Sequence, residues 1–408
     1  MNTKMQYYIL KEAVVVLLVM FMLSACGKTA SHVQKGDAPV SKAVSFDKLE
    51  WEREASVYNR GSFRYYLKKS LDNKYGWLTK VEITGTDKLR KMIFPKELDG
   101  ALLLLRIGFD ERELEEGAEL FYNLFGNRID SEGIQYNNRN NKSGNIEELV
   151  IPDSVQSIEG SAFAGLYSLK RIKLPVYLKR LCGGAFYDCT GLTNVEIGKK
   201  LEELRPLAFE GCSQLGSIRI SSDNNNYCEW GGFILDKRNW KTVMAVPAKE
   251  DLVIPAQAQS IGKYSFANSK VGKIRVERGN AVFAEDGDCI YRRDNQALAV
   301  GVVKRGEVII PDKVKELNGD SLLAGGKVER IYMPTGLEYL RGEWLDMVGG
   351  DCIYIFYNEK LPQIVEPSGR TASVPMWGSK VMVPRKLIQK YSKWLKENGS
   401  EIPCVELK

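Results

Sequence analysis

Side chains that carry catalysis are scarce in this sequence of 408 residues. The single histidine, His32, lies in a polar segment near the start, which excludes Ser-His-Asp and Cys-His catalysis and His-ligated zinc from the remainder. No Gly-x-Ser-x-Gly, dinucleotide-binding or phosphate-loop pattern is present. Asp223, Asp286 and Asp288 could be nominated as the acid pair of a glycosidase. They lie in expected loops, where acidic side chains are usually solvated, so we predict no catalytic residue, metal or cofactor.

The cysteines are the remaining reactive side chains. There are eight, and setting Cys26 apart leaves an odd number. Cys189 and Cys212 occupy the same position in two neighbouring repeats, described below, so a disulfide between them is within reach. The favoured alternative is a row of small buried apolar groups, because Leu166 fills this position one repeat earlier.

The composition bounds the class of protein. The chain is 44% hydrophobic and 27% charged, which is typical of a globular protein with two or three units. A net charge of +6 is a mild excess for this length. We therefore expect no nucleic-acid partner.

The N-terminal residues have the pattern of a targeting signal. Residues 13–23 are eleven unbroken apolar residues, which is too short for a membrane span of about 20 residues. The run ends in Leu-Ser-Ala-Cys at 23–26 and resembles the lipobox of bacterial lipoproteins. The resemblance implies cleavage before Cys26 and a lipid anchor on that residue. We predict a signal peptide at 1–25 and a flexible, polar tether at 26–45.

One pattern recurs in steps of 23 residues. An apolar residue, an Ala-Phe pair, a leucine and two alternating apolar residues return three times at this interval. The matching sets include Ile158, Leu181 and Leu204; Phe163, Phe186 and Phe209; Leu169, Leu192 and Leu215; and Ile172, Val195 and Ile218. A fixed period of this length indicates a solenoid, whose stacked units share one core. The alternation around Lys173 predicts a short strand.

Longer blocks overlie this repeat. The sequence from Ile218 returns at Ile274, 56 residues later, and each block contains an insert with a hairpin pattern. The expected hairpin turns lie at 236–239 and 293–295.

These repeats resemble the BspA-type leucine-rich repeat family of bacterial surface proteins. The best match is IPDSVQSIEGSAFAGLYSLKRIKLP at 151–175. The resemblance implies an α+β repeat solenoid at 146–345 with β-hairpin inserts. An N-terminal region at 46–145, in which degenerate repeats are one interpretation, and a C-terminal cap at 346–408 flank it. The amphipathic segment 386–398 predicts a helix that covers the last repeat.

Outward strand positions contain many cations. Six of the ten collected from the alignment are Lys or Arg, which predicts a basic strip on one sheet face. The candidate ligand-binding residues are Arg171, Lys173, Arg219, Lys273, Arg275, Arg330 and Tyr332. A solvated polar face with a chance excess of cations is the alternative. A second candidate surface consists of the insert aromatics Tyr227, Trp230 and Trp240, whose alternative role is the small core of the insert.

We therefore expect a lipid-anchored binding or adhesion protein of the bacterial cell envelope, at the outer membrane. It would recognise a protein or an anionic glycan through the repeat sheet face. The first alternative is a structural lipoprotein that faces the periplasm, because no acidic run follows Cys26. The second is a hydrolase with its site in 46–145, which the absent motifs disfavour.

Overall fold

The structure, a computed structural model, describes residues 48–85, 89–98, 102–108, 121–125, 128–130, 133–135, 143–266, 269–319, 321–341, 352–365 and 380–407. The predicted signal peptide and tether, including Cys26, lie outside these residues. The chain divides into two units, Met1–Cys228 and Glu229–Lys408. No helix within the described ranges is long and apolar enough to cross a membrane.

The first unit consists of short strands and one described 3₁₀ helix, η3 (Ser143–Asn145). Its strands are β1 (Ser56–Arg60), β2 (Phe63–Lys69), β3 (Tyr75–Ile83), β4 (Lys91–Ile93), β5 (Glu97–Leu98), β6 (Leu102–Ile107), β7 (Phe121–Tyr122), β8 (Arg128–Asp130), β9 (Gly133–Gln135), β10 (Glu148–Val150), β11 (Ser157–Ile158), β12 (Arg171–Lys173), β13 (Arg180–Leu181), β14 (Asn194–Ile197), β15 (Glu203–Leu204) and β16 (Ser217–Ile220). β17 (Tyr227–Trp230) contains the boundary between the units.

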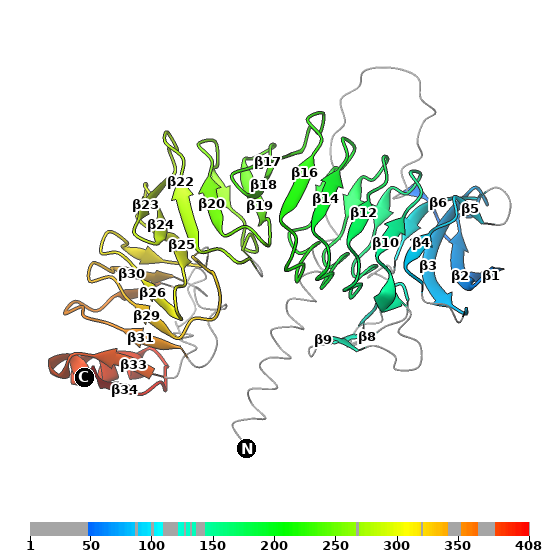
Figure 1. Ribbon diagram of the computed structural model, residues 1–408. Helices are drawn as coiled ribbons and strands as arrows, with labels where there is room; N and C mark the ends of the chain where they lie inside the picture. The colour runs from blue at the N-terminus through cyan, green and yellow to red at the C-terminus, as the bar shows by residue number, and fades with distance from the viewer. Residues whose placement is uncertain are drawn as a thin grey trace. The chain divides into compact units, whose positions relative to one another are not determined.

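Two sheets carry the repeats of the first unit, and their strands pair parallel except for β1, β2 and β3, which pair antiparallel with one another, and β5, which pairs antiparallel with β6. The front sheet, as we call it, contains β4, β10 and β12 and continues with the pair β14–β16. Figure 1 shows these five strands side by side. The back sheet has the order β1-β2-β3-β6-β11-β13-β15. Strand partners such as Ser157 and Arg180 stand one sequence repeat apart, so the period is the hydrogen-bond register of the stack.

The second unit repeats this plan around two inserts. Its elements are β18 (Phe233–Asp236), β19 (Lys241–Ala245), β20 (Asp251–Ile254), β21 (Ser260–Ile261), β22 (Lys273–Val276), β23 (Phe283–Asp286), β24 (Cys289–Arg292), β25 (Leu298–Val302), β26 (Glu307–Ile309), β27 (Glu316–Leu317), β28 (Leu322–Ala324), β29 (Arg330–Tyr332), β30 (Tyr339–Arg341), β31 (Ile353–Ile355), β32 (Gln363–Val365), β33 (Lys380–Val383), η4 (Arg385–Leu387), α2 (Ile388–Glu397) and β34 (Cys404–Glu406).

The pairing in this unit confirms the predicted hairpins. β18 pairs with β19, and β24 with β25, both antiparallel and joined at the turns expected from the sequence. The front sheet of this unit consists of the pair β20–β22 and the five-stranded order β26-β29-β31-β33-β34. The strands β27, β30 and β32 form a smaller sheet.

The predicted repeat solenoid is present, but the α+β class is borne out only in part, because the described residues contain one α-helix, α2, and otherwise form a β-solenoid. The return segments between strands are turns, in which alternate amides bond to the next rung, as we call each stacked repeat, and the intervening amides bond within their own turn. Phe163 N donates to Ala185 O at 2.8 Å, and Phe186 N to Ala208 O at 2.9 Å. Amides used between rungs cannot form the i to i−4 bonds of a helix.

Aromatic rings fill the centre of the first unit. Phe163, Phe186 and Phe209 are fully buried and stack with centroid distances of 5.3 and 5.6 Å. Phe94 meets Phe163 edge to face at 5.8 Å, which extends the row by one position. The repeated Ala-Phe pair therefore provides one ring for each rung, and the small alanine leaves room for it.

The described cysteines are thiols and not disulfides. The Cys189 thiol donates to Phe163 O at 3.3 Å and the Cys212 thiol to Phe186 O at 3.1 Å. Both side chains are fully buried, which agrees with the favoured interpretation as a row of small apolar groups. Burial raises the pKa of the Cys289 thiol to about 12.

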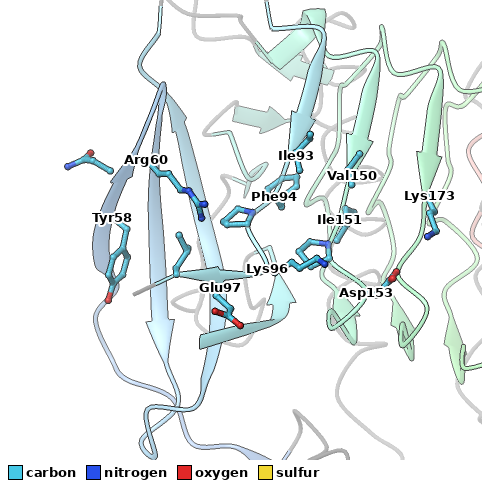
Figure 2. A pocket seen from close by; sticks show the side chains of 14 residues that line it. Tyr58, Arg60, Ile93, Phe94, Lys96, Glu97, Val150, Ile151, Asp153 and Lys173 are labelled. Atoms are coloured by element: carbon cyan, nitrogen blue, oxygen red, sulfur yellow. The ribbon is translucent and has the colours of Figure 1, made fainter. Parts of the chain in front are cut away.

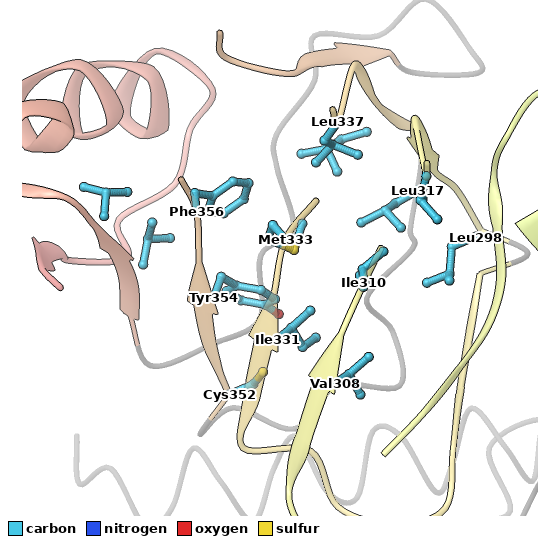
Figure 3. Close-up of a cluster of buried hydrophobic side chains, with 14 of the residues drawn as sticks. Leu298, Val308, Ile310, Leu317, Ile331, Met333, Leu337, Cys352, Tyr354 and Phe356 are labelled. Carbon is cyan, nitrogen blue, oxygen red and sulfur yellow. The ribbon is translucent and has the colours of Figure 1, made fainter. Parts of the chain in front are cut away.

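The predicted C-terminal helix is confirmed. α2 buries Tyr391, Trp394 and Leu395. The Tyr391 ring lies 5.2 Å from Phe356, and its hydroxyl donates to Asn358 O at 3.1 Å. Figure 3 shows the core beneath it, in which successive front strands contribute apolar side chains to one layer. The strand β34, which the sequence did not predict, follows the helix and pairs with β33.

A buried polar network joins the N-terminal strands to the first rungs. Arg106 and Glu159 are 3% and 4% exposed, and their Nε and Oε1 atoms are 2.6 Å apart. Ser157 Oγ donates to the same carboxylate oxygen at 2.6 Å. The Arg106 guanidinium lies over the Trp77 ring at 4.1 Å from its centroid. These contacts compensate both buried charges, which are stable in a core only when paired.

We predict that Phe186→Ala lowers the free energy of unfolding by about 3–5 kcal/mol, because it leaves a cavity between two stacked rings. Urea denaturation followed by circular dichroism measures the loss. The exposed control Val176→Ala should change stability by less than about 0.5 kcal/mol. Equal effects of the two substitutions would contradict the stacked core.

Asp188 offers a pH-dependent prediction. It has φ +55° at the position that Gly165 and Gly211 fill in adjacent rungs, and burial raises the pKa of its carboxyl. The carboxylate therefore opposes folding at neutral pH. Asp188→Asn, which tolerates the same φ, should stabilise the protein at pH 7. The gain should shrink as the pH falls through the folded pKa and vanish below the ordinary value of 3.8. Thermal melting from pH 3 to pH 7 tests this, and a gain that is independent of pH would contradict it.

Candidate binding face

The candidate residues lie on the front strands with the expected orientation. Arg171 and Lys173 are exposed on either side of buried Ile172 in β12. Lys273 and Arg275 are exposed in the same way on β22. The remaining three are Arg219 on β16, which is exposed, Arg330 on β29, which is exposed, and Tyr332, which is half-buried. Their part in binding stays a prediction.

Acidic side chains from neighbouring strands interleave with these cations. Arg219 lies 3.7 Å from Glu196, which is one repeat earlier, and Arg330 lies 2.8 Å from Glu307. Glu148 stands beside Arg171 in the strand register but bonds to Lys91 at 2.7 Å. The hydrogen bond from Lys91 lowers the pKa of Glu148, and the charge of Arg171 adds to this effect. The face therefore has mixed charge and is less basic than the sequence predicted.

Four candidate cations form no close ion pair in the part of the chain that the structure describes. Within the described ranges, no carboxylate oxygen lies within 4.0 Å of the side-chain nitrogens of Arg171, Lys173, Lys273 or Arg275. Arg171 and Lys173 belong to the first unit, and Lys273 and Arg275 to the second. Each unit thus presents one pair of cations two residues apart on a front strand.

Exposed apolar side chains accompany the charges, and the sequence reasoning missed them. Ile309 is 69% exposed on β26 and stands beside Tyr332 in the strand register. Ile93 is 59% exposed on β4 and stands beside Val150. Alternation within residues 91–93 and 307–309 is the signal that would have found them, since each isoleucine occupies an outward position. Exposed apolar residues next to charges are typical of protein-binding surfaces.

The other nominated residues have different surroundings, and Asp223 is exposed. Asp288 and Lys304 are 2.5 Å apart, and Asp286 lies 3.3 Å from Lys313. Tyr227 is buried, and its hydroxyl accepts a bond from Leu204 N at 3.0 Å. Trp230 is 52% exposed and Trp240 is half-buried. The described side chains include no group of three or more His, Cys, Asp or Glu residues that could hold a metal ion.

Comparison with known proteins bears out the repeat resemblance. Residues 135–233 match the model of the BspA type leucine rich repeat region with six copies. The pneumococcal vaccine antigen PcpA is 14% identical, with a TM-score of 0.40 over 88% of this chain and 100% of that one. A leucine rich cell surface protein from Faecalibacterium prausnitzii A2-165 is also 14% identical, with a TM-score of 0.40 over 86% and 95%. A leucine-rich repeat protein from Bacteroides ovatus is 13% identical, with a TM-score of 0.32 over 88% and 99%. No curated protein matches the sequence.

The mixed charge yields a test of its own. Glu196→Gln removes the carboxylate beside Arg219, and both side chains are more than three-quarters exposed. Stability should change by less than about 0.5 kcal/mol, because exposed pairs contribute little. Elution from a heparin column should move to higher salt, because the face becomes more positive. Glu250→Gln, which makes the same charge change outside the front strands, is the control. Identical elution of the two variants would show that heparin does not contact this face.

Proposed function

We propose that this chain is a non-enzymatic binding protein of the bacterial cell envelope, held to the membrane by a lipid on Cys26. Its partner is the acidic surface of another protein, which it contacts through the front strands. The observation that carries the proposal is the set of exposed cations Arg171, Lys173, Lys273 and Arg275, which lack ion-pair partners in the described part of the chain.

The rigidity of the strands supports this function. Each cation sits on a strand whose adjacent residue is buried in the core, as Ile172 and Ile274 are. Its Cα position is therefore fixed by packing, and binding orders only the end of the side chain. Pre-ordered side chains lower the entropic cost of association. Stacked repeats commonly bind partners on such extended faces.

The interleaved carboxylates favour a protein over a uniform polyanion. A polymer with regularly spaced negative charges would meet Glu196 and Glu307 as well as the cations. A protein surface can place its own cations opposite these carboxylates, and like charges placed opposite each other reduce affinity for the wrong partner. The exposed Ile309 adds apolar contact area that a protein would use and a polyanionic glycan would not.

The test measures binding of soluble residues 27–408 to a panel of acidic envelope and matrix proteins and of acidic and neutral glycans. The variant Arg171→Glu/Lys173→Glu/Arg219→Glu/Arg275→Glu reverses four charges on the front strands. The matched control Lys199→Glu/Lys200→Glu/Lys249→Glu/Lys270→Glu reverses four exposed charges outside the strands.

We expect protein binding that weakens at high salt, because the Debye length shortens, and that falls at least about tenfold in the strand variant alone. Equal loss in both variants would show that only net charge matters. Binding of glycans but of no protein would contradict the proposed partner class.

A further inference from the structure

The two sheets of the first unit end at different positions. The back sheet continues beyond β6 through β3, β2 and β1. In the front sheet, β4 pairs with β10 on one side, and no other described strand pairs with it. This difference leaves a step at the N-terminal end, where the hairpin β1–β2 extends past the last front strand. A groove of about 860 Å³ lies at this step.

The groove lies between the hairpin and the first front strands. Tyr58, Asn59 and Arg60 of β1 line one side. Ile93 and Val150 line the other, and Ile93 is 59% exposed there. Figure 2 shows Arg60 extending from the hairpin toward the Ile93 side. The volume is within the range of ligand pockets. Apolar and charged side chains both line the groove.

The edge of β4 offers unused backbone hydrogen bonds. The contacts to β10 involve Arg90 O, which accepts from Glu148 N at 3.1 Å, and Phe94 N, which donates to Val150 O at 3.0 Å. Since strand amides alternate in direction, the N–H and C=O groups of Lys91 and Ile93 point away from β10. No described residue bonds to them. An open edge of this kind is a template on which another strand can pair.

The charges around the groove favour an acidic occupant. Arg60, Lys96 and Lys173 line it, all three are exposed, and none has a carboxylate within the ion-pair limit in the described ranges. The carboxylates of Glu97 and Asp153 also line the groove and partly offset these positive charges. One of these, Asp153, accepts a bond from Val176 N at 3.3 Å, so part of its charge is already engaged. The groove therefore presents an excess of available positive charge beside an apolar strand.

We propose that this groove binds an extended acidic peptide from a partner protein, which pairs with β4 as an added strand. The peptide backbone bonds to Lys91 and Ile93. Alternate side chains point toward Ile93 and Val150, and acidic side chains at the flanks meet Arg60, Lys96 and Lys173. Main-chain bonds supply affinity and the side-chain contacts supply specificity, as in other cases of strand addition. This site adjoins the binding face proposed above and shares Ile93, Val150 and Lys173 with it, but the hairpin residues and the open edge of β4 belong to the groove alone.

The experiment selects peptides from a phage library of random ten-residue sequences on soluble residues 27–408. We expect enriched sequences with Asp or Glu between β-branched or aromatic residues. Selected peptides are then synthesised, and their affinity is measured by fluorescence anisotropy for the unchanged protein and for two groove variants.

The first variant, Ile93→Pro, removes an amide on the open edge and leaves the Phe94 amide that bonds to β10. The second, Arg60→Glu/Lys96→Glu, reverses the groove charge without altering a strand edge. Both should weaken binding at least about tenfold. Lys199→Glu/Lys200→Glu is the control of equal charge change, and it should leave affinity within about twofold. Circular dichroism establishes whether each variant is folded. If Ile93→Pro unfolds, the charge variant Arg60→Glu/Lys96→Glu alone tests the proposal.

Three results would overturn the proposal. The first would be a library that yields no peptide above background. The second would be selected peptides that bind both groove variants as tightly as they bind the unchanged protein. The third would be a heparin tetrasaccharide that displaces the peptides and binds the Ile93→Pro variant as tightly as the unchanged protein. The variant Arg219→Glu/Arg275→Glu separates this site from the binding face. Loss of peptide affinity in that variant, with the groove variants unaffected, would assign the peptides to the front strands.

Discussion

The hydrogen bond between one rung and the next is the constraint on which the rest of the structure depends. A repeat of 23 residues has one apolar side and too little chain to cover it, so it is stable only against a neighbour. In this chain the strands bond to the neighbouring rung, and so do the return segments, as Phe186 N does to Ala208 O at 2.9 Å. The same residue types therefore recur at a fixed interval in the sequence, because each residue must lie beside its equivalent in the next rung. The stack of phenylalanine rings and the thiols of Cys189 and Cys212 follow from the same alignment.

A stack of rungs exposes an unpaired edge at each end, and the two ends of this chain resolve the problem differently. At the C-terminus α2 covers the last core layer with Tyr391, Trp394 and Leu395. At the N-terminus the back sheet is continued by three strands, which the buried pair Arg106–Glu159 and the Trp77 ring fasten to the first rungs. The front sheet has no such continuation among the described residues, and this asymmetry produces the groove beside β4.

The repeat positions, the buried rings, the hairpin turns and the C-terminal helix could all be predicted, because each depends on residues close together in the sequence or on a strict period. The turn conformation of the described return segments could not, since Ala-Phe turns have ordinary composition and only the neighbouring rung shows where their amides bond. The mixed charge of the binding face was missed for a similar reason. Arg219 was counted as a cation, but its partner Glu196 lies one repeat away and meets it only in the stack. A recurring role of asparagine could not be predicted either. Asn224, Asn280 and Asn358 each use the side-chain amide to bond two carbonyls of the preceding rung, in segments whose sequences otherwise differ.

Rigid stacking also connects the fold to binding, since cations on fixed strands and a strand edge with fixed amides both depend on rungs that do not move apart. Hydrogen–deuterium exchange of the native protein, read by mass spectrometry over residues 159–169 and 182–192, tests this most directly. If the return turns bond to the next rung, the amides of Phe163 and Phe186 exchange as slowly as those of β12 and β14, at the rate of global unfolding. Exchange at the rate of an exposed turn, with slow exchange confined to the strands, would show that the rungs are held by the strands alone and would contradict the account of a uniformly bonded stack.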